Sequence, residues 1–197
     1  MLENEDNFIR SAANGDPEAF GSLYDEYYPR IYRFVLLKVR SREDAEDLAH
    51  QIFLNAWQHI SSYRPQGFPF SSWLYRIARN AVIDYYRTSK QEASIEEADP
   101  ELFAAGERIQ ADANTALELG RVQNAISRLS PLHQDVIIMR FVEELTIRET
   151  AATLKKSEGA VKLLQHRAMK ELQNALAEME TGPAASDAPI GNESTAL

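Results

Sequence analysis

Apolar residues recur at helical spacing along most of the chain, and the pattern is clearest over residues 145–172. Two apolar stripes lie there, each with members three or four residues apart. The first consists of Ile147, Ala151 and Leu154, and the second of Val161, Leu164, Ala168 and Leu172. Ser157 stands between them as a natural N-cap for a helix that begins at Glu158. Two short helices so close in sequence bury both stripes by crossing steeply, which predicts a helix-turn-helix.

The outward face of the second helix in this pair is polar and partly basic. It carries Lys162, Gln165, His166 and Lys170, with Ser157 and Glu158 at its N-terminus. A helix of this kind fits the major groove of DNA, and its N-terminus favours phosphate. The pattern therefore indicates DNA binding, and the alternative is an ordinary helical hairpin with a solvated face.

Four further helices are predicted in the first ninety residues. A short helix covers about residues 3–13, and Asp16-Pro17 supplies an N-cap and a first-turn proline for the next. That second helix continues to about residue 39 and is expected to bend near Pro29. Ser41 caps a helix over residues 42–59, and a strongly periodic helix follows over residues 71–88.

Aromatic and basic residues gather around the start of this last helix. The loop before it interleaves proline and glycine with Tyr63, Phe68 and Phe70, and loops seldom display aromatic side chains without a use for them. The polar side of the helix carries Arg76, Arg79, Asn80, Tyr86 and Arg87. This combination favours binding of single-stranded nucleic acid, because aromatic rings stack on bases and arginines hold phosphates. The alternative is a solvated amphipathic helix, with Trp73 part of the core.

Helical periodicity returns near Leu119, and Ser130-Pro131 opens another helix that runs to about residue 141. No strand-like alternation is present, so the predicted fold is all-α in two small domains. The expected divisions are an N-terminal domain over 1–90, an acidic flexible linker over 91–118, a helix-turn-helix domain over 119–178 and a disordered tail over 179–197.

Composition adds one difficulty for a DNA-binding protein. The chain is 44% hydrophobic and 26% charged, as in globular domains, yet its net charge is −9. Proteins that bind DNA alone are normally basic. Residues 91–120 hold eight acidic residues against a single basic one, Arg108, so this segment contributes −7 of that charge. The two helical regions keep local basic patches, and DNA binding is expected only with the help of a partner.

Other classes of protein are excluded or disfavoured by composition. The chain has no cysteine, which excludes disulfides and thiolate chemistry and fits the cytoplasm. No apolar run is long enough to insert in a membrane, and the acidic start MLENEDNF is unlike a signal peptide. We therefore expect a cytoplasmic protein without membrane insertion.

Four segments together resemble the bacterial RNA polymerase sigma factors of the sigma-70 family, in particular the extracytoplasmic-function (ECF) group. Three lie in the N-terminal domain: DPEAFGSLYDEYYPRIYRFV, DAEDLAHQIFLNAW and FSSWLYRIARNAVIDYYR. The fourth lies in LSPLHQDVIIMRFVEELTIRETAATL with SEGAVK. The resemblance implies region 2-like and region 4-like domains. It also implies a non-enzymatic function that needs no cofactor: directing RNA polymerase core to promoters and assisting promoter melting.

The resemblance also implies a role for individual residues. The set expected to bind the β′ clamp helices of polymerase is Asp47, Leu48, His50, Gln51 and Phe53. The set expected to bind the opened −10 element is Tyr63, Arg64, Phe68, Phe70, Ser72, Trp73, Arg76, Arg79, Asn80 and Arg87. The set expected to bind the −35 element is Arg148, Lys155, Lys156, Ser157, Glu158, Lys162 and His166. Further implied partners are the β flap of polymerase and an anti-sigma factor.

Three other interpretations compete with this one. Asp47 and His50 stand three apart like half of a helical metal site, but no second pair of that kind appears. A stand-alone helix-turn-helix regulator that binds duplex DNA would leave the basic and aromatic region 68–87 unexplained. A sigma-like interaction module with a weak −35 preference is the third, because Leu163 and Leu164 stand where the family often has serine and arginine.

Overall fold

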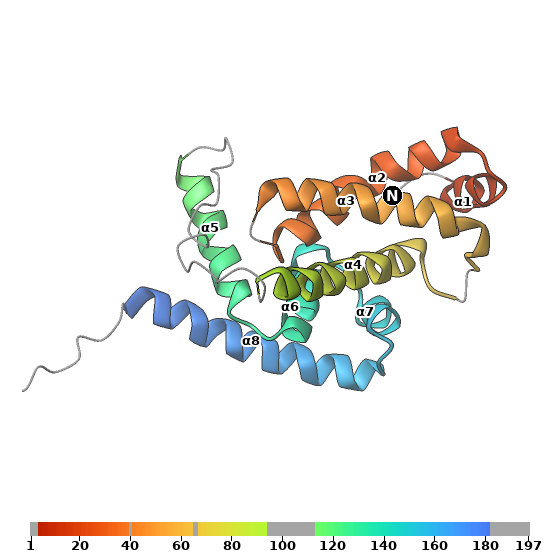
Figure 1. Ribbon diagram of the computed structural model, residues 1–197. Coiled ribbons are helices and arrows are strands. Elements are labelled where there is room, and N and C mark those ends of the chain that lie inside the picture. The colour runs from red at the N-terminus through yellow and green to blue at the C-terminus, as the bar shows by residue number, and fades with distance from the viewer. Residues whose placement is uncertain (1–3, 40, 65–66, 94–112, 182–197) are drawn as a thin grey trace, which may run out of the picture.

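The computed structural model describes residues 4–39, 41–64, 67–93 and 113–181, and all regular elements in these ranges are helical. The N-terminal domain contains α1 (Glu5–Ala13), α2 (Pro17–Leu36), α3 (Arg42–His59), the short η1 (Ile60–Ser62) and α4 (Phe70–Ala93). The C-terminal domain contains α5 (Ala113–Ser127), α6 (Pro131–Ile137), η3 (Ile138–Val142), α7 (Ile147–Leu154) and α8 (Glu158–Thr181), as Figure 1 shows. The all-α fold class is therefore confirmed.

Two helices of the N-terminal domain begin at the caps that the sequence predicts. The Asp16 carboxylate accepts hydrogen bonds from the backbone N–H groups of Glu18 and Ala19, at 3.0 and 3.2 Å, so α2 begins at Pro17. The helix then continues through Pro29 to Leu36. Ser41 Oγ accepts a hydrogen bond from the backbone N–H of Asp44 at 3.2 Å, at the start of α3.

The core of the N-terminal domain lies between α2, α3 and α4. Leu23, Phe34, Ile52 and Leu74 are fully buried there. Beside them an aromatic layer joins α2 to α3, with three rings of α2 around one ring of α3. This layer fixes which face of α3 points outward, because each ring contact holds one side of the helix against α2.

The helix-turn-helix of the C-terminal domain is confirmed in α7 and α8. Thr146 and Glu149 form a capping box at the start of α7, with bonds of 3.2 and 2.6 Å. Ser157 Oγ accepts a hydrogen bond from the backbone N–H of Ala160 at 3.2 Å, which caps α8 as predicted. Lys155, in the turn, adopts the left-handed conformation with φ 53° and ψ 46°.

Several boundaries differ from the sequence prediction. The helix predicted to run from Ser130-Pro131 to residue 141 is α6 followed by a π-helical turn, η3. Helix α4 ends at Ala93 and α5 begins at Ala113, so helices enter the acidic segment 91–118 from both ends. Helix α8 extends to Thr181, into the segment expected to be a disordered tail. The rest of the linker and tail, 94–112 and 182–197, lies outside the described residues. No helix in the described ranges is long and apolar enough to cross a membrane.

The two domains pack against each other. Helix α7 lies against α4 (Figure 1), and the buried apolar residues of both domains form one continuous cluster. The amide of Gln123 on α5 donates to the carbonyl of Leu36, the last residue of α2, and to that of Val39 just beyond the helix, at 2.7 and 3.1 Å. This packing decides which of the predicted binding residues reach the surface.

Candidate nucleic-acid interface

The residues predicted to bind polymerase lie on α3, and most of them face outward. Asp47, His50 and Gln51 are exposed, and Leu48 is half-buried. Phe53 is only 3% exposed, because its ring packs inside the aromatic layer against α2. Phe53 therefore lies inside the domain in this structure and holds α3 against α2, and its part in polymerase binding stays a prediction.

The aromatic residues near the start of α4 fall into two groups. Phe70 is 2% exposed, and Tyr63 and Trp73 pack against it with ring centroids 5.5 and 5.3 Å away. Phe70 is therefore a core residue in this structure, and its place in the −10 set stays a prediction. Phe68 is 37% exposed and Arg64 is exposed, so these two keep surface positions. Tyr63 and Trp73 are half-buried between the core and the surface.

The polar side of α4 divides in the same way. Asn80 and Arg87 are exposed, and Arg87 pairs with the exposed Asp84 at 3.2 Å. Arg79 Nε instead donates to the Asp135 carboxylate of the C-terminal domain at 2.6 Å. Arg76 Nη2 donates to the carbonyl oxygen of Ala152 at 3.0 Å, and Ser72 Oγ to that of Glu149 at 3.4 Å. Three members of the predicted −10 set thus face the other domain.

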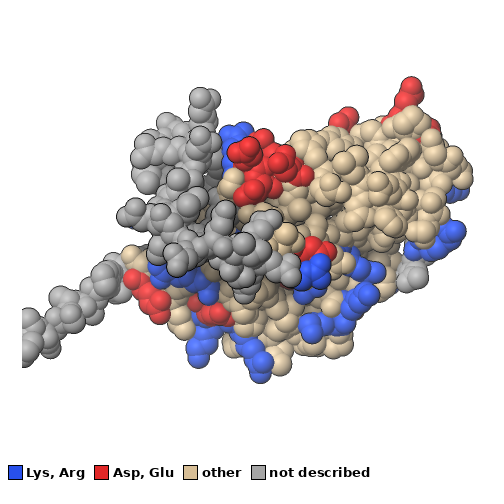
Figure 2. All heavy atoms as spheres, in the orientation of Figure 1, with Lys and Arg blue, Asp and Glu red and all other residues tan. Residues whose placement is uncertain are grey.

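The predicted −35 set lies around the α7–α8 turn and the first turns of α8. Figure 2 shows Lys and Arg side chains gathered along the lower edge of the molecule, over α7 and α8. Arg148 is exposed and also touches the N-terminal domain: its guanidinium donates to the Gly67 carbonyl at 3.3 Å and lies 5.7 Å from the Phe68 ring centroid. The remaining members, Lys155, Lys156, Ser157, Glu158, Lys162 and His166, are all exposed.

A groove between the two domains brings the two DNA-binding sets together. It lies between the loop before α4 and the α7–α8 turn. Its lining consists of Phe68, Arg148, Ala151, Ala152, Lys155, Lys156 and Glu158. One of these belongs to the predicted −10 set and four to the −35 set. In the packed arrangement, surfaces expected to bind separate stretches of a promoter are therefore neighbours.

A buried cluster around Glu143 joins the domains, and sequence reasoning missed it. The Glu143 side chain has no exposed surface. Its carboxylate accepts from Arg33 Nε at 2.7 Å and Nη2 at 3.1 Å, from the Tyr75 hydroxyl at 2.8 Å and from Arg30 Nε at 3.4 Å. Arg30 also donates to the Glu143 carbonyl at 2.8 Å. Burial and the neighbouring Glu143 carboxylate raise the pKa of Tyr75, so its hydroxyl remains a donor.

A second cluster surrounds Asp135, which is 1% exposed. Lys38, itself 7% exposed, donates to one carboxylate oxygen and Arg79 to the other. Burial lowers the pKa of the Lys38 ammonium, and the nearby Asp135 carboxylate opposes that shift. The available sequence signal was an acid within an apolar stripe, because Asp135 continues the helical spacing of Leu132, Val136 and Met139.

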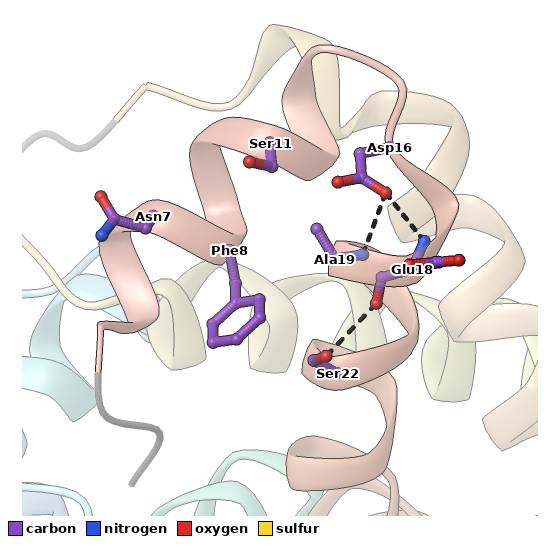
Figure 3. A pocket seen from close by; sticks show the side chains of 7 residues that line it. All are labelled: Asn7, Phe8, Ser11, Asp16, Glu18, Ala19 and Ser22. Atoms are coloured by element: carbon purple, nitrogen blue, oxygen red, sulfur yellow. Dashed lines mark hydrogen bonds between the residues drawn. The ribbon is translucent and has the colours of Figure 1, made fainter.

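Two other candidate sites give less support for a binding function. A hollow between α1 and α2 is lined by Asn7, Phe8, Ser11, Asp16, Glu18, Ala19 and Ser22 (Figure 3). Its Asp16 carboxylate is the α2 cap, and Ser22 Oγ donates to the Glu18 carbonyl at 3.3 Å. No group of three or more metal-ligand side chains occurs among the described residues, so the metal-site interpretation of Asp47 and His50 gains no further ligand.

The chain consists of two small helical domains, and the second exposes a basic helix-turn-helix. This combination is typical of transcription proteins that bind DNA. Comparison with known families narrows this class. The Sigma-70 region 2 profile matches residues 23–92, and the Sigma-70 region 4 profile matches residues 125–174. The region 2 match covers the basic and aromatic part of the chain that a stand-alone regulator leaves unexplained, so that alternative is not favoured.

Relatives of known identity agree with this assignment. The chain is 35% identical over 171 residues to the ECF RNA polymerase sigma factor BldN of Streptomyces coelicolor, covering 85% of this chain and 64% of BldN. It is 31% identical over 180 residues to the ECF RNA polymerase sigma factor SigW of Bacillus subtilis, covering 87% of this chain and 96% of SigW. The chain belongs to the ECF sigma factors of the sigma-70 family.

Solved structures show the same fold. CnrH, in complex with the cytosolic domain of CnrY, superimposes with a TM-score of 0.70 at 24% identity, covering 89% of this chain and 98% of CnrH. The sigma factor RpoE, in complex with the anti-sigma factor NepR from Bartonella quintana, gives a TM-score of 0.68 at 23% identity, covering 80% and 96%.

Proposed function

We propose that this chain carries bacterial RNA polymerase core to a set of promoters and helps open them, acting by binding alone and in the cytoplasm. The observation that carries the proposal is the position of the exposed residues. Asp47, His50 and Gln51 project from α3 of the region 2-like domain, and basic residues project from α8 of the region 4-like domain. The protein can therefore bind a partner through α3 while it binds DNA through α8.

Polymerase core supplies the positive charge that the acidic chain lacks for DNA binding. The net charge of −9 opposes DNA binding by the free chain. The polymerase provides a positive channel that brings the DNA phosphates to the local basic residues. In this proposal α3 docks on the β′ clamp helices and the C-terminal domain on the β flap. Helix α4 and the loop before it bind the opened −10 strand, and α8 enters the major groove of the −35 element.

We also propose that an anti-sigma factor controls the protein. CnrH and RpoE were both solved with a protein bound, CnrY and the anti-sigma factor NepR respectively. The two-domain fold shared with them offers this chain the same kind of control.

Association with core polymerase tests the docking part of this proposal. The full chain is expected to co-sediment with purified core, and Asp47→Arg is expected to weaken that association at least tenfold because it reverses an exposed charge on α3. Asp25→Arg, an equal charge change at an exposed position on α2, is the matched control and should bind like the parent. Equal binding by all three proteins would remove α3 as the docking helix.

A further inference from the structure

The first turns of α8 expose one apolar side chain among polar ones. The exposed residues between positions 158 and 170 are Glu158, Gly159, Lys162, Leu163, His166, Arg167 and Lys170. Leu163 is 50% exposed and has the only apolar side chain in this set. Its neighbour Leu164 is half-buried and packs against the core. Of these two leucines, Leu163 is therefore the one that presents its side chain to a partner.

Helical geometry places Leu163 on the outer face of α8. Val161 and Ala168 are fully buried and mark the inner face. Leu163 follows Val161 by two positions, a rotation of about 200° around the helix axis, so the two side chains point in nearly opposite directions. His166 and Arg167, three and four positions after Leu163, are its neighbours on the outer face. A molecule that contacts this face near the start of α8 must therefore contact Leu163.

Gln165, a polar residue that the sequence places on the same face, is already engaged within the domain. It is half-buried, and its side-chain oxygen accepts a hydrogen bond from Arg140 Nε of η3 at 3.0 Å. Arg140 also donates to the carbonyl of Leu145. These bonds hold the Gln165 amide against the body of the domain. Lys162 and Leu163 are the exposed residues beside it in the second turn of α8.

The charges around Leu163 favour nucleic acid as the partner. Glu158 is the single acidic residue between positions 155 and 170. The basic side chains exposed over the same positions are those of Lys155, Lys156, Lys162, Arg167 and Lys170. Figure 2 shows the basic side chains over α7 and α8 along one edge of the molecule. One exposed leucine is common on protein surfaces and by itself needs no ligand. Leu163, however, lies on a basic helix face that fits the major groove, where base edges are its neighbours.

We propose that Leu163 recognises a thymine of the −35 element by packing on the C5-methyl group in the major groove. Thymine is the only base with an apolar group on this edge, and apolar side chains recognise it there. Cytosine or guanine at the same place would lose water from a polar edge without gaining a hydrogen bond, which disfavours both. This inference rests on the proposed function, because it concerns the −35 contact named there. Leu163 then shifts the −35 preference towards A·T pairs and does not abolish it.

Transcription from templates with a randomised −35 region tests the proposal. Starting from a promoter that the parent transcribes with purified core, the parent should enrich templates with thymine at a fixed position. Leu163→Ser should lose this preference and keep the preferences at other positions, whereas Leu163→Met, which stays apolar, should retain it. Leu176→Ser is the matched control, because it makes the same substitution at a side chain that is 38% exposed and lies about 20 Å further along α8. It should select the same sequences as the parent.

Removal of the methyl group from the DNA gives a sharper readout. Deoxyuridine pairs with adenine as thymidine does but lacks the C5-methyl group. Its substitution for the selected thymine should lower transcription by the parent about fourfold at subsaturating protein, the factor for one methyl group left out of an apolar contact. Leu163→Ser should transcribe the two templates equally, and Leu176→Ser should discriminate between them as the parent does. The comparison with the parent needs no variant, so it remains decisive if Leu163→Ser folds poorly.

Three results separate the possible failures. Equal transcription of the thymidine and deoxyuridine templates by the parent overturns the methyl contact. A loss of transcription in Leu163→Ser that is the same for every −35 sequence overturns base recognition and assigns Leu163 to a protein partner. Absence of any transcript with the parent on a pool of promoter fragments removes the proposed function and this inference with it. Transcripts that show no thymine preference remove the inference alone.

Discussion

The turn of the helix-turn-helix contains a residue in a conformation that glycine would adopt more easily. Lys155 has φ 53° and ends α7 in the left-handed region. The backbone N–H of Lys156 donates to the Ala151 carbonyl at 2.9 Å, so the turn is fixed by its own hydrogen bond. Substituting Lys155→Gly should therefore stabilise the protein, because it removes side-chain strain while keeping this bond.

The size of the gain follows from two opposing effects. A left-handed conformation costs a residue with a Cβ atom about 1–2 kcal/mol. Glycine loses more backbone freedom on folding, which returns roughly 0.5–1 kcal/mol of that gain. Subtracting the midpoints of these two ranges gives a net increase in the free energy of unfolding of about 0.8 kcal/mol. If the two domains melt together, the expected rise in Tm is roughly 1–4 °C.

Differential scanning calorimetry of the full chain measures this shift. Lys156→Gly is the matched control: it removes the same charge one position later, where φ is not positive, and should lower Tm. Lys155→Asn should fall between parent and glycine variant, because asparagine tolerates the left-handed region. Equal Tm changes in Lys155→Gly and Lys156→Gly, or a lower Tm in the former, would refute the reasoning from backbone strain.

Three further expectations concern other parts of the C-terminal domain. Asp135→Asn should lower the free energy of unfolding more than Lys38→Met/Asp135→Asn does, because the single change leaves a buried ammonium unpaired, a loss of about 3–5 kcal/mol. Burial already lowers the pKa of Lys38 below its usual 10.5, so the folded Asp135→Asn protein loses this proton at a pH where the unfolded chain still binds it. The stability of this variant should therefore rise as the pH approaches 10.5. Urea titrations at neutral pH and at about pH 9 check both the loss of stability and its pH dependence. Thr146→Ala should lose about 1 kcal/mol in urea unfolding and Thr146→Ser much less, since only serine keeps the capping hydroxyl. Leu163→Ser should change unfolding by under about 0.5 kcal/mol, because the side chain is 50% exposed, yet alter relative transcription from promoters with different −35 sequences, because apolar side chains contact thymine methyl groups.

Local patterns predicted most of the helices. The helix over 42–59 coincides with α3, because a capping serine, an acidic first turn and an unbroken apolar stripe all agree there. The same holds for the cap at Ser157 and the start of α8. The π-helical turn at Ile138–Val142 was not predicted, since its hydrogen bonds depend on how the chain leaves α6 and not on side-chain spacing.

The candidate site was predictable only in part. Periodicity separates the faces of a helix, which placed Asp47, Asn80 and Arg87 on the surface. It does not tell which surface another domain covers. Arg76 and Arg79 lie on the polar side of α4 as expected, but their partners come from residues more than fifty positions away. Phe53 and Phe70 were placed by resemblance in binding sets, although both pack in the core.

Transcription by purified polymerase core on a pool of promoter fragments, with and without this protein, tests the central claim most directly. We expect new, specific transcripts that depend on the protein and disappear with Asp47→Arg or Arg87→Glu, because both side chains are exposed on the proposed binding faces. Asp25→Arg, outside those faces, should keep them. Specific binding of the free chain to duplex DNA, with neither transcripts nor association with core, would contradict the claim and indicate a stand-alone regulator.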